Sequence, residues 1–245
     1  MKKLTTALCA VLLMILVLMP GAAAAGPALS ATRAYCIIDA DTGLVLAQQN
    51  MNEELHPASI TKVMTLLLTF EAIHDGRLTL DTLVPVSEHA YHMGGSQIWL
   101  KEGEQMRVED LIKAVCVVSG NDAAVALGEH LAGSEEAFVA RMNERAKELG
   151  MNDTHFVNCT GLPADGHVTS AYDIALMSRE LIWRHPDIRR FTTIWMDSLR
   201  GGASMLVNTN KLLKRYSGIT GLKTGTTSGA GVCISASATR DGLKL

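Results

Sequence analysis

The segment His56-Pro57-Ala58-Ser59-Ile60-Thr61-Lys62 decides how this chain folds and where its reactive groups lie. It opens an apolar run that predicts a helix continuing to about His74. Ser59 and Lys62 are three positions apart, so a helical backbone places both side chains on one face. A serine with a lysine one turn away is a nucleophile beside a base, and the positive end of the helix favours a developing alkoxide. Taken alone, Ser59 would also suit a helix N-cap.

Two further motifs follow in the chain, each occurring once. Ser119-Gly120-Asn121 separates a predicted helix over 108–118 from another running from Asp122 to about Leu131, and Lys223-Thr224-Gly225 lies in a predicted strand. Singly, the first motif is typical of a turn and the second of a strand end. Together and in this order, the three motifs predict acyl transfer through a serine without a histidine base.

Strand-forming residues concentrate at the two ends of the chain. Residues 34–39 and 44–49 predict a hairpin whose turn contains Gly43, and residues 221–226 and 231–239 predict a second pair of strands. The sequence therefore predicts an α/β fold whose sheet is built from both chain ends.

The middle of the chain predicts a helical lobe. Ser134 caps one helix and Ser170, with Asp173, caps another that ends near His185. The apolar stripe of the first of these helices is Phe138, Met142, Ala146 and Leu149. Residues 84–106 predict only irregular structure.

The N-terminus predicts a secretory signal peptide over residues 1–25. Lys2 and Lys3 precede an apolar run from Leu8 to Met19, and the small residues 22–25 suit a peptidase. The apolar run is shorter than the roughly 20 residues that a membrane-spanning helix needs. We therefore expect an exported protein cleaved near Ala25.

Composition excludes some partners. The chain has 22 basic and 25 acidic residues; removal of Lys2 and Lys3 leaves 20 basic residues and a net charge of −5. No basic run interleaved with aromatic residues remains, which argues against a nucleic-acid partner. Residues 26–245 suffice for one large domain.

The cysteines and histidines indicate neither a metal nor another cofactor. No cysteine pair has zinc-site or redox-motif spacing, and buried free thiols are the expected state, with a disulfide left open. The cysteines concerned are Cys36, Cys116, Cys159 and Cys233. His89 and His92 are three residues apart, but no acidic ligand set indicates a metal there, and a solvated surface is expected.

At these motifs the chain resembles the serine-type D-alanyl-D-alanine carboxypeptidases of the low-molecular-weight penicillin-binding protein group. The resemblance covers nearly the whole of residues 26–245. It is carried by the three motifs and by Asp41-Thr42-Gly43, His56-Pro57-Ala58-Ser59, Gly94-Gly95-Ser96, Gly161-Leu162, Thr226-Thr227 and Ala236-Ser237-Ala238-Thr239. It implies the β-lactamase/DD-peptidase-like fold: an antiparallel sheet packed against a mostly helical lobe, with the active site between them.

The resemblance also implies roles for the first two motifs. Ser59 would attack the penultimate D-alanine carbonyl of a peptidoglycan stem peptide ending in D-Ala-D-Ala, and β-lactams would acylate the same serine. Lys62 would act as general base, which burial and the nearby Lys223 would assist by lowering its pKa. Ser119 would relay a proton, and Asn121 would hold Lys62 and the substrate amide.

The third motif would bind substrate. Lys223 and Thr224 would hold the terminal carboxylate, and Gly225 would let the substrate backbone lie along the strand edge. The backbone N–H groups of Ser59 and Thr226 would form an oxyanion hole.

Compared with that family, the chain stops early, at residues 241–245. The resemblance implies a further central strand between residues 34–39 and 231–239, so we expect an incomplete catalytic domain with two unpaired edges. A further arginine that helps to bind the substrate carboxylate, a C-terminal β-rich domain and an amphipathic membrane anchor would also be missing. Membrane association is expected only through that anchor.

Two alternative functions remain. Class A β-lactamases share the trio but need a glutamate in a Glu-x-x-x-Asn type loop, and no such loop is expected between Ser119 and Lys223, where Glu180 lies in a predicted helix. A non-catalytic sensor of cell wall or β-lactam would have no need of an activated nucleophile. A Ser-His-Asp hydrolase is weaker still, since no Gly-x-Ser-x-Gly elbow occurs.

Overall fold

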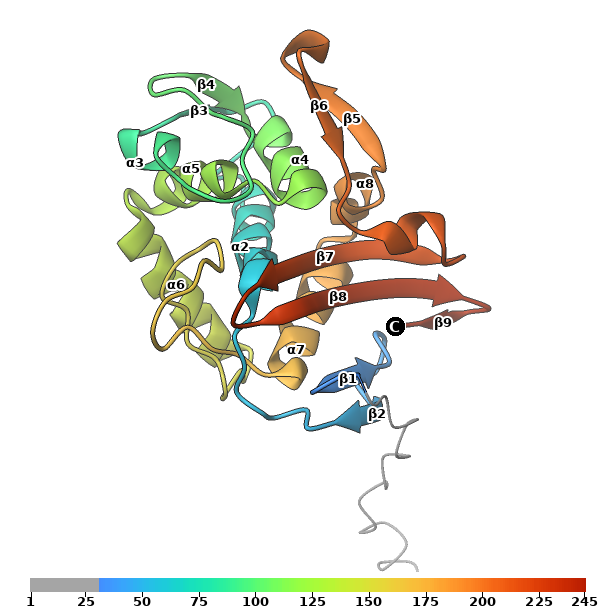
Figure 1. The fold of residues 1–245 in the computed structure, drawn as a ribbon. Coiled ribbons are helices and arrows are strands. Elements are labelled where there is room, and N and C mark those ends of the chain that lie inside the picture. Colours follow the sequence, from blue (N-terminus) through green and yellow to red (C-terminus); the bar gives the residue numbers. More distant parts are fainter. Residues whose placement is uncertain (1–30) are drawn as a thin grey trace, which may run out of the picture.

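The computed structural model describes residues 31–245, so the predicted signal peptide lies outside the described residues. Strands from both ends of the described chain gather on one side of the molecule, and helices from its middle pack on the other (Figure 1). The predicted fold class is confirmed. Among residues 31–245 there is no helix with the length and apolar character needed to cross a membrane.

The first two strands form the predicted hairpin. β1 (Tyr35–Ile38) pairs antiparallel with β2 (Val45–Gln49). The Asp39 carboxylate shapes the turn between them by accepting a 2.7 Å hydrogen bond from the Thr42 backbone N–H. Gly43 completes the turn at φ 77°, a conformation that costs little without a Cβ atom.

The last three strands form a separate antiparallel ladder in the order β7-β8-β9. β7 (Ile219–Thr227) pairs with β8 (Gly231–Arg240), as predicted, and β8 pairs with the short β9 (Leu243–Lys244). No ladder joins β1 to β8 among the described strands. A single backbone bond, from Ala40 N–H to the Lys244 carbonyl at 2.8 Å, links the N-terminal hairpin to β9.

Helix α7 (Ala171–Arg184) packs against both groups of strands. Arg179 Nε donates to the Ala40 carbonyl at 2.8 Å, beside the hairpin turn. Ser178 Oγ lies 2.8 Å from Ser235 Oγ on β8. One helix thus contacts the strands from both chain ends and fixes their relative position.

The helical lobe surrounds α2, which is buried on almost every side. Its helices begin and end close to the predicted positions, because their caps and apolar periodicity are local signals. Phe138, Met142 and Ala146 are buried as predicted, whereas Leu149 is only partly buried. The helices are α2 (Lys62–His74), α4 (Val108–Val118), α5 (Asn121–Ala132) and α6 (Glu135–Glu148).

The stretch predicted as irregular, 84–106, contains regular structure. β3 (Leu83–Pro85) pairs with β4 (Gln105–Arg107), and the single-turn helix α3 (Glu88–Tyr91) follows β3. Three-residue strands that pair across some twenty residues leave no periodic signal in the sequence. Further short elements are η2 (Pro186–Ile188), α8 (Arg189–Thr192), β5 (Met196–Leu199), η3 (Arg200–Gly202), β6 (Ser204–Val207) and η4 (Lys211–Lys214).

The four cysteines of the described chain are free thiols. Cys116 and Cys159 are buried, and Cys36 and Cys233 are partly buried in strands. Burial raises the pKa of Cys116 to about 12, so that this thiol stays protonated. Residues 31–245 contain no cluster of three or more His, Cys, Asp or Glu side chains placed to hold a metal ion.

One glycine allows the loop after α6 to press against the segment that carries Ser59. Gly161 adopts φ 82°, and a Cβ atom there would lie only 1.8 Å from the Ala58 carbonyl oxygen. Gly166, in the same loop, adopts φ 76°, but a Cβ atom there would meet nothing within 4 Å. The two glycines therefore separate the cost of the backbone conformation from the cost of the contact.

Gly161→Ala should destabilise the protein far more than Gly166→Ala. Both changes force an alanine into the left-handed region, which costs about 1–2 kcal/mol. Only Gly161→Ala adds a backbone clash, so we expect its total loss to exceed about 3 kcal/mol. Urea unfolding of the two variants measures this difference. Equal losses would contradict the close approach of the loop to Ala58.

Candidate active site

Ser59 lies in a tight turn that leads directly into the buried helix α2. The 3₁₀ turn η1 (Ala58–Thr61) precedes Lys62, the first residue of α2. Ala58 has φ 49°, a left-handed conformation that is strained for a residue with a side chain. Ser59 is therefore presented by a strained turn at the N-terminal end of a helix.

Lys62 is completely buried and lies beside Ser59. Its Nζ atom is 3.0 Å from Ser59 Oγ and donates a 2.6 Å hydrogen bond to the Thr160 carbonyl. Burial, followed by the positive charge of Lys223, holds the pKa of Lys62 well below its usual value. A lowered pKa favours the neutral amine, which is the form that a general base requires. No motif or spacing in the sequence indicates the role of the Thr160 carbonyl.

Lys223 is the second buried lysine, and it projects from β7. Its Nζ atom donates a 2.8 Å hydrogen bond to the Thr224 carbonyl. Burial lowers the pKa of Lys223 to about 8. The two lysines lie close together, as predicted, because the positive charge of Lys223 lowers the pKa of Lys62.

Ser119 ends α4 in the left-handed conformation, at φ 64°. Its Oγ atom is buried, yet it has no hydrogen-bond partner among the described residues. A buried hydroxyl without a partner is unusual, because losing its bonds to water costs about 1–3 kcal/mol. The orphan hydroxyl is therefore available for a proton relay.

Asn121 bonds differently from the prediction. Its side-chain amide donates a 2.6 Å hydrogen bond to the Gly94 carbonyl, while Lys62 bonds to Ser59 and Thr160 instead. Its neighbour Asp122 is buried and accepts hydrogen bonds from the backbone N–H groups of Ile98 and Leu100. These side chains fix the 94–100 loop beside the site, a role that requires contacts distant in sequence.

Gly225 makes a close contact that the sequence did not predict. A Cβ atom at Gly225 would lie 2.8 Å from the Ser59 backbone nitrogen and 3.0 Å from the Ala58 Cβ atom. The missing side chain therefore makes room for the turn that carries Ser59. This contact brings β7 against the nucleophile.

Two backbone N–H groups are candidates for an oxyanion hole, those of Ser59 and Thr226. The Ser59 N–H donates to no other described residue. The backbone groups of Ala238 on β8 bond to Leu245, on the β9 side. Backbone groups along β8 face β9 and β7 in alternation, so those of Val232 also face away from β7, and Val232 and Thr226 form a non-hydrogen-bonded pair. The Thr226 N–H therefore faces the open edge of β7. Thr224 on the same edge shares a 2.6 Å hydroxyl contact with Thr209.

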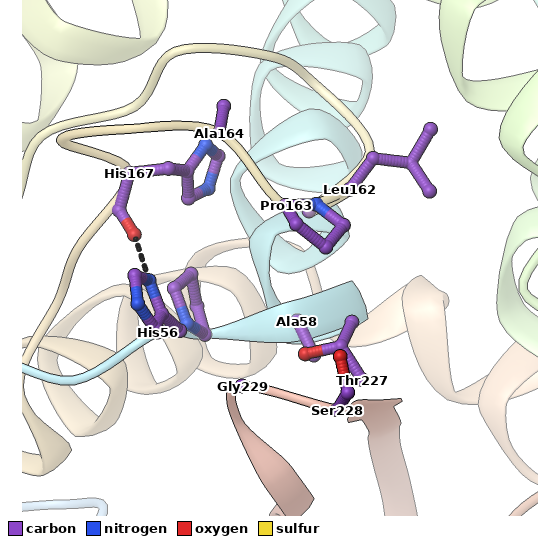
Figure 2. Close-up of a pocket in the computed structure, with 11 residues that line it drawn as sticks. His56, Ala58, Leu162, Pro163, Ala164, His167, Thr227, Ser228 and Gly229 are labelled. Carbon is purple, nitrogen blue, oxygen red and sulfur yellow. Dashed lines mark hydrogen bonds between the residues drawn. The ribbon is translucent and has the colours of Figure 1, made fainter.

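A cavity of about 130 Å³ adjoins the turn that carries Ser59. Figure 2 shows His56 and Ala58 on one side, His167 and Pro163 on the loop above, and the β7–β8 turn below. The dashed line marks the 3.0 Å hydrogen bond from His56 Nδ1 to the His167 carbonyl. His167 is a buried residue that the sequence analysis did not single out.

Two glutamates bear on the β-lactamase alternative. The stretch from Glu148 to Asn152 has the Glu-x-x-x-Asn spacing, contrary to the expectation that none occurs. The structure places Glu148 at the end of α6, where it forms a 3.0 Å ion pair with Arg141. Glu180 on α7 forms a 2.8 Å ion pair with Arg145. Both carboxylates are engaged away from Ser59.

Comparison with known proteins identifies the relatives of this chain. The profile of peptidase family S11, described as D-alanyl-D-alanine carboxypeptidase, matches residues 21–245. The D-alanyl-D-alanine carboxypeptidase DacF of Bacillus subtilis is 48% identical over 211 residues, which cover 85% of this chain and 54% of DacF. DacC of Escherichia coli is 38% identical, with 87% of this chain and 54% of DacC covered. The chain thus spans about half the length of these relatives.

Solved structures agree with this grouping. The D-alanyl-D-alanine carboxypeptidase DacD from Francisella tularensis superposes with a TM-score of 0.83 at 31% identity, covering 87% of this chain and 64% of DacD. Penicillin-binding protein D2 from Listeria monocytogenes, in its ampicillin-bound form, gives a TM-score of 0.77 at 33% identity. Here 86% of each chain is covered.

Replacing Lys223 with glutamine should raise the pKa of Lys62. The charge of Lys223 is the second cause of the lowered value, and only burial would remain to lower it. Lysine ¹³Cε chemical shifts followed by NMR report the titration of Lys62 directly. Thr224→Val is the matched control on the same strand and removes no charge. An unchanged Lys62 titration in Lys223→Gln would contradict the coupling of the two lysines.

Proposed function

The chain belongs to the D-alanyl-D-alanine carboxypeptidase family, peptidase family S11, and from this membership we propose its activity. It removes the terminal D-alanine from peptidoglycan stem peptides through an acyl-enzyme on Ser59, and β-lactams acylate the same residue. The observation that carries this proposal is the pair formed by Ser59 and the buried Lys62, whose reactive atoms lie 3.0 Å apart.

The acylation step follows from that pair. Ser59 Oγ attacks the carbonyl carbon of the penultimate D-alanine, and its proton passes to the neutral Lys62 amine. The carbonyl oxygen becomes an oxyanion between the N–H groups of Ser59 and Thr226. Oxyanion-hole donors of this kind contribute about 3 kcal/mol each.

Collapse of the tetrahedral intermediate breaks the peptide bond and releases D-alanine. The leaving amine takes up a proton, and the unpartnered Ser119 hydroxyl is placed to relay it from Lys62. Water then attacks the ester carbonyl, transfers a proton to the base and releases the shortened peptide, which regenerates Ser59. Asn121 orients the 94–100 loop along this side of the site.

Substrate recognition rests on the β7 edge. Lys223 supplies the positive charge that a C-terminal carboxylate requires, and the Thr224 hydroxyl lies beside it as a second polar group. The substrate class is an extended peptide with a free carboxylate, laid along the β7 edge. Export by the N-terminal residues 1–25 would bring the protein to the compartment that holds this substrate.

Ser59→Ala should abolish both D-alanine release and covalent labelling by fluorescent penicillin. We expect both rates to fall more than about a thousandfold, because Ser59 carries the hydroxyl that hydrogen-bonds to Lys62 among the described residues. Labelling is measured by gel fluorescence and intact-protein mass. Ser217→Ala, a change in an exposed loop, is the control and should label normally. A labelled Ser59→Ala protein would remove Ser59 from the mechanism.

Lys62→Arg should acylate at no more than a few per cent of the wild-type rate. The guanidinium group keeps the positive charge but stays protonated above pH 12, so it cannot accept the Ser59 proton. Stopped-flow labelling with a reporter cephalosporin measures the rate constant. Lys101→Arg, at an exposed position, is the control for replacing a lysine with an arginine. A rate near that of the wild type would show that Lys62 is not the base.

Benzylpenicillin separates the carboxypeptidase from its alternatives. We expect one equivalent to form a long-lived adduct on Ser59, because neither Glu148 nor Glu180 is free to activate a deacylating water. Rapid multiple turnover would instead identify a β-lactamase. Binding with neither adduct formation nor D-alanine release would identify a non-catalytic sensor.

A further inference from the structure

A chain of hydrogen bonds runs from the 153–167 loop to the residue before the nucleophile. The Val157 N–H donates to His167 Nδ1 at 3.1 Å, and His167 Nε2 lies 2.9 Å from Thr61 Oγ1. Thr61 Oγ1 in turn donates to the Ala58 carbonyl at 2.9 Å. His167 and Thr61 are almost completely buried.

These contacts leave only one tautomer for His167. A backbone N–H can only donate, so Nδ1 must accept from Val157 and carry no proton. Nε2 therefore carries the proton and donates it to Thr61 Oγ1. The Thr61 hydroxyl consequently has its own hydrogen free for the Ala58 carbonyl. Each bond in the chain has a single direction, running from the loop toward Ala58.

The Ala58 carbonyl shares a rigid unit with the Ser59 amide. The peptide bond between them is planar and trans, so the Ser59 N–H points opposite to the Ala58 C=O. Gly161 packs against the same carbonyl, where a Cβ atom would come within 1.8 Å. Whatever fixes the Ala58 oxygen also fixes the direction of the Ser59 N–H, and the strained φ of Ala58 makes such support necessary.

We propose that His167 is a positioning residue for catalysis: acting through Thr61, it holds the Ala58–Ser59 peptide plane and aims the Ser59 N–H at the oxyanion. The inference rests on the proposed function of Ser59. It concerns the rate of acylation and not the binding of substrate, because the oxyanion forms only during the reaction.

The surroundings of His167 favour the neutral imidazole that this arrangement requires. Its titratable neighbours are His56, from the segment before Ser59, and His155, from its own loop. The Phe156 ring packs edge-on against the imidazole, with 5.9 Å between the ring centroids. Burial, with smaller contributions from His155 and His56, lowers the pKa of His167 to about 4. Histidine in an unfolded chain takes a proton near pH 6.5. The contribution of the neutral His167 ring to the free energy of unfolding is therefore complete above about pH 6.5, and it is lost as the pH falls toward 4.

Two amide variants separate the two nitrogen atoms of His167. The glutamine side chain places an N–H₂ group near the position of Nε2, so His167→Gln keeps the donor to Thr61. The asparagine side chain reaches only to the position of Nδ1, so His167→Asn keeps an acceptor for Val157 and loses that donor. The experiment measures the penicillin acylation rate constant and the pre-covalent dissociation constant separately by stopped flow.

We expect His167→Asn to lower the acylation rate constant about tenfold to a hundredfold, with the dissociation constant unchanged. His167→Gln should stay within about threefold of wild type. Equal rate constants in the two variants, or a loss confined to binding, would overturn the inference. A wild-type protein that is not acylated at all would instead contradict the proposed function.

A second pair of variants covers the case in which His167→Asn does not fold. Thr61→Ser keeps the hydroxyl and should acylate at a rate close to that of wild type, whereas Thr61→Val removes it and should show the same loss as His167→Asn. Circular dichroism and melting temperature establish that the Thr61 variants are folded. Equal rates in Thr61→Ser and Thr61→Val would overturn the inference.

The tautomer can be observed without any activity. In ¹⁵N-histidine NMR of the full chain, His167 should give the signals of a neutral ring protonated on Nε2, and these should persist from pH 8 down to about 5. A ring protonated on Nδ1, or a charged ring at pH 6, would refute the proposed direction of the hydrogen bonds.

Discussion

The structure depends on the burial of two lysines, Lys62 and Lys223, close enough for one charge to act on the other. Removing an ammonium group from water costs several kcal/mol, and a like charge nearby adds to that cost. Burial lowers the pKa of both lysines. Each ammonium group also donates to a backbone carbonyl, Lys62 to Thr160 and Lys223 to Thr224. That single constraint requires α2, β7 and the loop after α6 to meet at one point, and it lowers the pKa of Lys62, as its proposed role as general base requires.

The convergence of these three segments is made possible by two missing side chains. Gly161 approaches the Ala58 carbonyl and Gly225 approaches Ser59 and Ala58, each at a distance that a Cβ atom would not permit. The nucleophile turn is thus clamped between a loop and a strand. A turn with a strained Ala58 can persist there, because the surrounding contacts fix its conformation.

Buried side chains also fix segments farther from the site through hydrogen bonds. Asp122, next to the Ser119 motif, accepts backbone N–H groups of the 94–100 loop, and α7 ties the strands of the two chain ends together through Arg179 and Ser178. Buried polar groups with satisfied hydrogen bonds fix relative positions more strictly than apolar packing does. By contrast, the buried Ser119 hydroxyl has no hydrogen-bond partner among the described residues, which supports its proposed role as a proton relay.

The sequence by itself determined the helices, the two hairpins at the chain ends and the three motifs that bring Ser59, Lys62 and Lys223 together, since caps, apolar periodicity and motif spacing act over a few residues. It did not determine the hairpin of β3 and β4, whose three-residue strands carry too little pattern. Tertiary structure alone decided that Asn121 bonds to Gly94, that Gly225 makes room for Ser59 and that His167 supports Ala58. Each of these joins positions far apart along the chain, and only the folded backbone sets which distant atoms come within hydrogen-bonding or van der Waals distance.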